Sequence, residues 1–279
     1  TRPNPRFRWA AFGDWDRDYR VAHSGLAAEN VVALGAPYSD LLLPDSPAVT
    51  GFRREDFRDA YPVDVAGRKN ILLALTWHHG AALAQWGEDA TLLGRLFDHA
   101  AERGANVLVR MHDRRRFDPE YLHTIARAAA DRPTVWICFK DEHPDSLVDL
   151  LLSDVMVSNY SSLLNAFYYT GRPTVHLDPH RPGQEGYVYR RWKRGRLREE
   201  RAREAERIWK LDPGSIGGFR ASSFEQALEQ IDRALADPGC CAAPARAFTD
   251  RYITAVDGHT SARVAGFLEE WLARPEGDS

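Results

Sequence analysis

Residues 154–177 read DVMVSNYSSLLNAFYYTGRPTVHL, and this stretch predicts the fold. The apolar run Asp154–Ser158 has the length of a buried strand, and the segment 161–170 has the length of a helix. Gly171 and Pro173 stand where residues that end a helix are expected. A second β-branched run, Thr174–Leu177, follows. Strand, helix and strand at these spacings predict a right-handed crossover between parallel strands.

The same alternation extends over the chain from about residue 70. Short apolar runs are separated by longer helical stretches, which is the order of a parallel sheet flanked by helices. The other expected strands are Ile71–Thr76, Val107–Met111 and Thr134–Phe139, and the other expected helices lie near 88–103, 119–130 and 145–152. Five strands in this order predict an α/β fold with a Rossmann-like sheet.

The two ends of the chain differ from this pattern. Asn30–Leu34 is a candidate strand, Gly35–Pro37 a turn, and the stretch to Gly67 is predicted to be loop with one short helix. We interpret residues 1–65 as a lead-in or the remnant of an N-terminal domain, and 66–279 as the Rossmann-like domain. Three helical segments near 223–237, 244–255 and 259–273 are expected at its end.

The composition is that of an ordinary globular protein. The 279 residues include 37 Lys and Arg against 40 Asp and Glu, and 44% are apolar, which excludes disordered and collagen-like classes. Three cysteines, two of them adjacent, fit neither a disulfide framework nor a CxxC metal site. No apolar run approaches the about 18 residues of a membrane-spanning helix. We therefore expect a cytoplasmic protein.

Polar residues gather where predicted strands run into helices. In an open α/β sheet, ligands bind beyond the carboxyl ends of the strands, so these loops are the expected site. Ser161 and Ser162 follow a strand and begin an apolar helix, where hydroxyls and free N–H groups suit a phosphate. The alternative is that one of these serines only caps the helix.

Arg110 and His112 alternate at the end of another strand, so both side chains are expected on one side of the sheet. A guanidinium next to an imidazole suits a phosphoryl or diphosphate group, which the arginine would hold and the histidine could protonate. The alternative is a solvated basic loop, because 114–116 are three further arginines.

Other histidines give weaker indications. His78 and His79 are adjacent and have no carboxylate or thiolate at ligand spacing, so we expect no metal there. His176 and His180 could form a pocket wall or belong to a turn. The sequence has no Walker A, GxSxG, HExxH or GxGxxG motif, so the enzyme classes that carry them lose their usual support.

Residues 187–210, YVYRRWKRGRLREERAREAERIWK, contain ten Lys or Arg and four Glu in a chain whose net charge is −3. This asymmetry suggests an anionic partner, either a membrane surface or a polyphosphate polymer. The alternative is a surface helix from Leu197 onward with Glu and Arg paired at i,i+4. Nucleic acid is a weaker reading, because no recognised binding motif accompanies the charge.

Several motifs together resemble the C-terminal half of the CDP-glycerol glycerophosphotransferase family, the teichoic-acid and capsule polymerases. The resemblance covers roughly residues 31–270 and follows the family's order. The matching pieces are GAPYSD (35–40), ILLALTW (71–77), VRMH (109–112), DVMVSNYSS (154–162), GRP (171–173) and DGHTSARV (257–264). The family's corresponding patterns are GxPxxD, ILxAPTW, Arg-x-His, DxxITDYSS, Gly-Arg-Pro and DGxASxRV.

The resemblance implies a GT-B architecture in which this chain supplies the nucleotide-binding half. It also implies transfer of glycerol phosphate from CDP-glycerol to a hydroxyl of a growing cell-surface polymer, with release of CMP and no metal or cofactor. Thr76, Ser161 and Ser162 would then contact phosphates, and Arg110 and Arg263 would neutralise them. His112 would assist departure of the CMP phosphate. Such catalysis consists mainly of positioning and electrostatic stabilisation.

The remaining residues of these motifs are expected to bind substrate: Trp77, Asn159, Asp257 and Ser261. Asn159 stands where the family usually has Asp, and Ala74-Leu75 replaces Ala-Pro, so local base contacts are expected to differ. Peripheral attachment to the inner face of the membrane and oligomer formation are both compatible with this reading.

The family's N-terminal domain, with its WHGTPLK-type motif, has no counterpart in residues 1–65. A truncated chain, a separate acceptor-binding chain and loss of transfer activity remain open alternatives. Two further functions stay open: a GT-B glycosyltransferase or nucleotide-sugar epimerase, and a module that binds nucleotide or polymer without catalysis.

Overall fold

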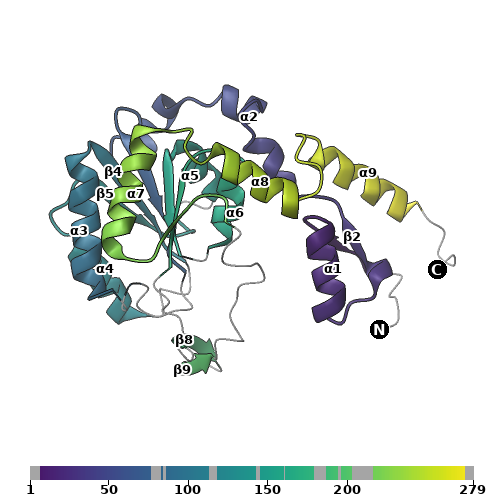
Figure 1. Ribbon diagram of the computed structural model, residues 1–279, viewed down its shortest axis with the longest axis horizontal. Helices are drawn as coiled ribbons and strands as arrows, with labels where there is room; N and C mark the ends of the chain where they lie inside the picture. The colour runs from purple at the N-terminus through teal and green to yellow at the C-terminus, as the bar shows by residue number, and fades with distance from the viewer. Residues whose placement is uncertain are drawn as a thin grey trace.

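The structure, a computed structural model, describes residues 7–76, 83, 86–112, 118–142, 145–159, 161–178, 187–193, 196–202 and 216–273. Its centre is a six-stranded sheet in the order β10-β7-β6-β3-β4-β5, in which every pair is parallel (Figure 1). The strands are β3 (Lys69–Leu73), β4 (Ala105–Arg110), β5 (Val135–Cys138), β6 (Val155–Ser158), β7 (Thr174–Leu177) and β10 (Phe219–Ala221).

This strand order is that of the six-stranded Rossmann fold. The first strand of the sheet along the chain, β3, lies next to the fourth, β6, and the chain runs outward from this pair in opposite directions. In such sheets the ligand crevice lies where the direction reverses, beyond the carboxyl ends of the two central strands. The predicted α/β class and the five predicted strands are confirmed, while β10 is a sixth strand that was not predicted.

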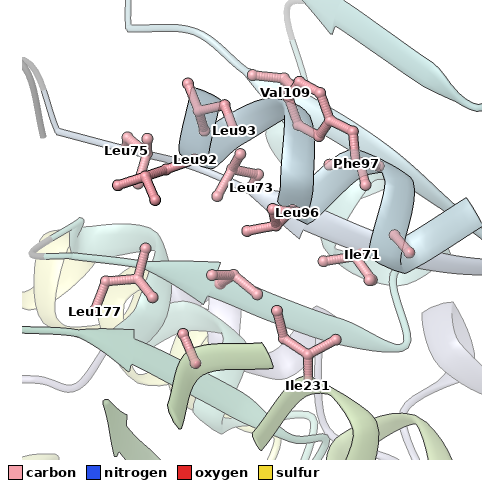
Figure 2. Close-up of a cluster of buried hydrophobic side chains, with 14 of the residues drawn as sticks. Ile71, Leu73, Leu75, Leu92, Leu93, Leu96, Phe97, Val109, Leu177 and Ile231 are labelled. Carbon is pink, nitrogen blue, oxygen red and sulfur yellow. The ribbon is translucent and has the colours of Figure 1, made fainter. Parts of the chain in front are cut away.

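Side chains of alternate strand residues enter two separate cores. Ile71 and Leu73 belong to one buried cluster, whereas Leu72 between them belongs to the other, as the pleat of a strand requires. Figure 2 shows the first cluster, in which Leu92, Leu96 and other helix residues cover the strands. Because both faces are covered, the strands are continuous apolar runs rather than alternating ones.

The helices form one layer on each face of the sheet. α3 (Asp89–Glu102), α4 (Pro119–Ala129) and α7 (Phe224–Ala236) contribute to the first cluster, and α5 (Ser146–Leu152), α6 (Ser162–Tyr168) and α8 (Ala242–Tyr252) to the second. These elements agree with the predicted helices to within three residues at each end. Gly171 has a φ of +67°, the left-handed conformation that ends a helix most readily at glycine.

The segment before the sheet has more structure than the sequence suggested. β1 (Trp9–Ala11), α1 (Asp14–His23) and β2 (Val31–Ala33) form a parallel strand–helix–strand unit, where the sequence predicted only a strand at Asn30–Leu34. Short turns of helix follow: η1 (Ala28–Asn30) precedes β2, and η2 (Pro37–Leu41), α2 (Pro47–Thr50) and η3 (Arg54–Ala60) lead into the large sheet. α9 (Thr260–Leu272) lies beside this unit, at the same end of the molecule as both termini (Figure 1).

The basic segment forms strands over part of its length. β8 (Tyr187–Lys193) and β9 (Arg196–Ala202) pair antiparallel, with Trp192 opposite Leu197. The alternative of a surface helix starting at Leu197 is therefore wrong over 197–202.

Candidate active site

The two central strands are linked at their carboxyl ends by polar contacts. Ser158 Oγ donates to Ala74 O at 2.5 Å, and the backbone N–H of Thr76 donates to Asn159 Oδ1 at 2.8 Å. Ser158 and Asn159 are buried, with 0% and 1% of their surface exposed. These contacts hold the loop after β3 against the loop after β6 at the switch point of the sheet.

A cavity of about 420 Å³ opens at this point. β4, α5, α6 and the loops that follow β3 and β5 contribute to its wall, and five of the site residues expected from the sequence line it. The lining residues are Ala74, Leu75, Thr76, Arg110, Met111, His112, Lys140, Ser146, Ser161, Ser162 and Leu163. The structure thus brings together Thr76, Arg110, His112, Ser161 and Ser162, which are separated by up to 86 positions in the sequence.

Arg110 ends β4 and is held by a buried carboxylate. Its Nη1 donates to Asp149 Oδ2 at 2.8 Å, and the two side chains are 8% and 2% exposed. Tyr61 donates its hydroxyl to the other oxygen, Asp149 Oδ1, at 2.7 Å. Burial and the Asp149 charge both raise the pKa of Tyr61, so the phenol stays protonated. Arg110 is therefore fixed from the sheet side while it lines the cavity, which excludes the alternative of a freely solvated loop arginine.

His112 lies two residues beyond Arg110 on the cavity wall and is exposed. Met111, between them, joins the buried apolar cluster on the opposite side of the sheet. This arrangement agrees with the alternation predicted for the end of the strand. An exposed imidazole on the wall can exchange protons with solvent and with a ligand, which is what a general acid requires.

Ser161 and Ser162 have different positions at the start of α6. Ser161 is the N-cap, and its Oγ accepts from the Leu163 N–H at 3.2 Å, so the capping alternative is confirmed for this residue. Ser162 is the first helical residue and is exposed. Both line the cavity, so capping does not remove Ser161 from the site.

Asn159 supports the cavity wall from behind, because its amide oxygen accepts the Thr76 N–H while the residue is 1% exposed. Its Nδ2 has no hydrogen-bond partner within the residues the structure describes. Trp77, the other expected residue of the neighbouring loop, lies outside the described residues, as do His78, His79 and His180. The role of Asn159 as a substrate-binding residue stays a prediction.

Asp257, Ser261 and Arg263 form a separate cluster at the start of α9 and are not among the residues that line the cavity. Arg263 Nη1 donates to both oxygens of Asp257 at 2.8 Å, and its Nη2 donates to Ala255 O at 2.7 Å. These bonds hold the loop that enters α9. Substrate binding by these three residues stays a prediction.

Asp40, from the GAPYSD motif, contacts the same cluster. Its two oxygens accept the N–H groups of Thr260 and Ser261 at 3.0 and 2.7 Å. Burial opposes ionisation of Asp40, but the bonds from Ser261 and Thr260 outweigh it and lower its pKa. Two motifs 220 residues apart therefore meet in one helix cap.

Arg172 of the GRP motif and His176 both make contacts inside the fold. Arg172 donates to the carbonyls of Leu151 and Ser153 at the end of α5. His176 lies within β7, 5% exposed, and its Nε2 is 2.6 Å from the Tyr168 hydroxyl. Burial lowers the pKa of His176 to about 4, so the ring is neutral. His176 lies in a strand and not in a turn, so the turn reading is wrong for this residue, while its role in a pocket wall stays a prediction.

The sequence missed four polar residues of the site: Lys140 and Ser146, which line the cavity, and Asp149 and Tyr61, which lie behind Arg110. Asp149 lies in a helix and Tyr61 in a polar lead-in, and neither stands near Arg110 in the chain. Lys140 follows the strand Val135–Cys138, so the rule that points to carboxyl-end loops could have found it. In the part of the chain that the structure describes, no three His, Cys, Asp or Glu residues are grouped so as to hold a metal ion.

These features define a Rossmann-like domain of the GT-B type, with its cavity at the switch point of a parallel sheet. The profile of the family described as CDP-Glycerol:Poly(glycerophosphate) glycerophosphotransferase matches residues 20–197, more than half of the chain. The chain belongs to this family, and the resemblance seen in the sequence is confirmed. No curated protein matches the chain.

Solved structures support the fold. The wall teichoic acid polymerase TagF is similar over 94% of this chain and 57% of its own, with a TM-score of 0.61 and 14% identity. A TagF variant soaked with CDPG is similar over 94% of this chain and 57% of its own, with a TM-score of 0.62 and 14% identity. A candidate UDP-N-acetylglucosamine 2-epimerase from Listeria monocytogenes is similar over 97% of this chain and 61% of its own, with a TM-score of 0.55 and 9% identity. The chain thus spans little more than half the length of TagF.

Among the helices that the structure describes, none combines the length and the apolar character needed to cross a bilayer.

Proposed function

We propose that this chain is the nucleotide-binding half of a transferase that moves glycerol phosphate, or a related polyol phosphate, from a CDP-linked donor to a polymer acceptor, releasing CMP. The observation that supports the proposal most strongly is that motif residues from distant parts of the chain line the same cavity. The family match covers Thr76, Arg110, His112, Ser161 and Ser162, and these residues, distant in sequence, line one cavity. The location of that cavity at the switch point is where Rossmann sheets bind nucleotides.

The lining suits a diphosphate better than an apolar ligand. Arg110 presents a fixed guanidinium, and the hydroxyls of Thr76, Ser161 and Ser162 can donate hydrogen bonds to phosphate oxygens. A volume of about 420 Å³ is within the range of small-molecule sites.

In the proposed step, the acceptor hydroxyl oxygen attacks the phosphorus of the glycerol-phosphate group. The bond from that phosphorus to the bridging oxygen breaks, and its electron pair leaves with CMP. His112 donates a proton to the departing CMP phosphate, while the proton of the hydroxyl passes to a base supplied by the acceptor half. Arg110 and the cavity hydroxyls stabilise the charge that develops, which is the main contribution of proteins to phosphoryl transfer.

Two alternatives use the same fold. A GT-B glycosyltransferase or an epimerase-like enzyme would bind a uridine nucleotide, and the structural similarity to the Listeria protein is the observation that keeps this reading open. A module without catalysis would bind the nucleotide or the polymer but not turn over.

The experiment is calorimetric titration of the 279-residue chain with CDP-glycerol, CMP, UDP and UDP-N-acetylglucosamine in one buffer. We expect the cytidine ligands to bind at least tenfold more tightly than the uridine ligands. Tighter binding of the uridine ligands would contradict the proposal and favour a GT-B glycosyltransferase or an epimerase-like enzyme. Absence of binding by all four would leave only a module that has kept the fold and lost the site.

We also propose that residues 187–210 contact an anionic surface, either the inner face of a membrane or the phosphate groups of the polymer. The support is the excess of six positive charges over these 24 residues. Co-sedimentation with vesicles of anionic lipid should exceed that with neutral vesicles and should fall as salt is raised. Equal binding to both vesicle types would contradict a membrane contact.

A further inference from the structure

The charge of Arg110 is already balanced within the protein. Asp149 approaches its Nη1 to 2.8 Å in a site where both side chains are almost fully buried. Together the two groups form a pair of zero net charge, so an anionic ligand is attracted less than it would be by an unpaired guanidinium. Arg110 can still donate hydrogen bonds to a phosphate, but it does not supply net positive charge to the cavity.

Among the lining residues that the structure describes, Lys140 is the one lysine or arginine besides Arg110. It follows β5, the strand paired with β4, so it stands beside Arg110 at the carboxyl edge of the sheet. The residue is exposed and forms no ion pair with any residue that the structure describes. Of the acids next to it in the turn, Glu142 accepts the Phe139 N–H at 2.9 Å, and neither Asp141 nor Glu142 lines the cavity.

We infer that Lys140 is the phosphate-binding cation of this cavity, and that Arg110, neutralised by Asp149, acts there as a rigid hydrogen-bond donor. The inference rests on the proposed function, since it takes the ligand to be a nucleotide with an anionic phosphate bridge. A lysine ammonium is a mobile point charge with three donors, so it can follow the phosphate as a bond to phosphorus breaks. The two cations thereby divide positioning and charge compensation between them.

The test compares three ligands that differ in phosphate content: cytidine, CMP and CDP-glycerol. Lys140→Gln removes the charge and keeps most of the side-chain length. We expect it to weaken binding of CMP and CDP-glycerol about tenfold, the usual size for loss of one charge-assisted contact, and to leave cytidine binding unchanged. Lys140→Arg should restore most of the loss, and Lys140→Glu should exceed it.

A matched control is Lys69→Gln. Lys69 is also an exposed lysine, but it is the first residue of β3 and so lies at the amino ends of the strands, away from the cavity. Its ammonium pairs with Asp154 at 3.4 Å. This variant should bind all three ligands like the unaltered chain. In addition, the salt dependence of CMP binding should decrease in Lys140→Gln and not in Lys69→Gln, because only the first loses a charge near the phosphate.

The outcomes separate the inference from the proposed function. If the unaltered chain prefers cytidine ligands and Lys140→Gln binds CMP equally well, the inference is overturned while the donor assignment stands. If uridine nucleotides bind better and Lys140→Gln weakens UDP relative to uridine, the donor assignment fails and the inference stands. Failure of every nucleotide to bind the unaltered chain would overturn both.

Discussion

Replacing Arg110 by Ala should destabilise the fold strongly, apart from any effect on ligand binding. The change leaves the Asp149 carboxylate, 2% exposed, without the guanidinium that lies 2.8 Å from it. Breaking a buried pair by removing one partner costs about 3–5 kcal/mol, because the remaining charge stays desolvated. The free energy of unfolding, measured by urea denaturation of the full chain, should fall by this amount.

A matched control separates burial from ion pairing as such. Arg17 and Asp14 lie 2.7 Å apart, a distance like that of the buried pair, but their side chains are 39% and 67% exposed. Arg17→Ala should therefore cost less than about 1 kcal/mol. Equal losses in Arg110→Ala and Arg17→Ala would refute the reasoning, since burial would then have no influence on the cost.

A combined variant distinguishes stability from binding. Arg110→Met, Asp149→Leu and Tyr61→Phe together remove the buried charges and the hydroxyl that donates to Asp149. Replacing a buried ion pair by apolar residues of similar volume is often neutral, so most of the stability should return. Donor binding should still be more than tenfold weaker, because no guanidinium remains on the cavity wall. Unchanged donor affinity would contradict the assignment of Arg110 to the site.

Three other variants test particular contacts. His112→Ala should leave binding of the CDP-linked donor almost unchanged and lower turnover by at least about 100-fold once the acceptor half is supplied; an unaltered rate would remove His112 from the chemistry. Asp40→Ala should cost about 1 kcal/mol at pH 7, where the carboxylate caps α9. Because the pKa of Asp40 is lowered in the fold, this contribution is lost as the pH falls below about 4, so the two proteins should converge in acid. The pKa of His176 is lowered from 6.5 to about 4, so the unfolded chain takes up the proton first and stability should fall between pH 6.5 and 4; in His176→Phe this part of the pH dependence, on the order of 3 kcal/mol, should vanish.

The sheet was predictable where strands are continuous apolar runs. β3, β4, β6 and β7 are buried along most of their length, so each has a clear sequence signal. β10 is three residues with an arginine at its centre, and α1 has Asp16 as its buried residue, so neither presents an apolar pattern. β8 and β9 contain many charged residues and have no apolar pattern of either period, so the sequence did not distinguish a strand from a helix over Leu197–Ala202.

The cavity was predictable in outline, because parallel strands bring their carboxyl ends to one edge whatever lies between them. That rule predicts Thr76, Arg110, His112 and the two serines at one edge of the sheet. It could not predict the hydrogen-bond partners of those residues, because hydrogen bonds between distant segments produce no recognisable pattern in the sequence.

By itself, the sequence determined the parallel α/β sheet, the loops that form its functional edge and the family, because these depend on local hydrophobic pattern and on short motifs in a set order. Only the tertiary structure decided that Asp149 accepts hydrogen bonds from Arg110 and from Tyr61, which lies 88 residues before it, and that Asp40 caps α9 from 220 residues away. It also placed Lys140 on the cavity wall. The physical reason is that burial and charge balance depend on every group that packs around a side chain, and these groups come from all parts of the chain.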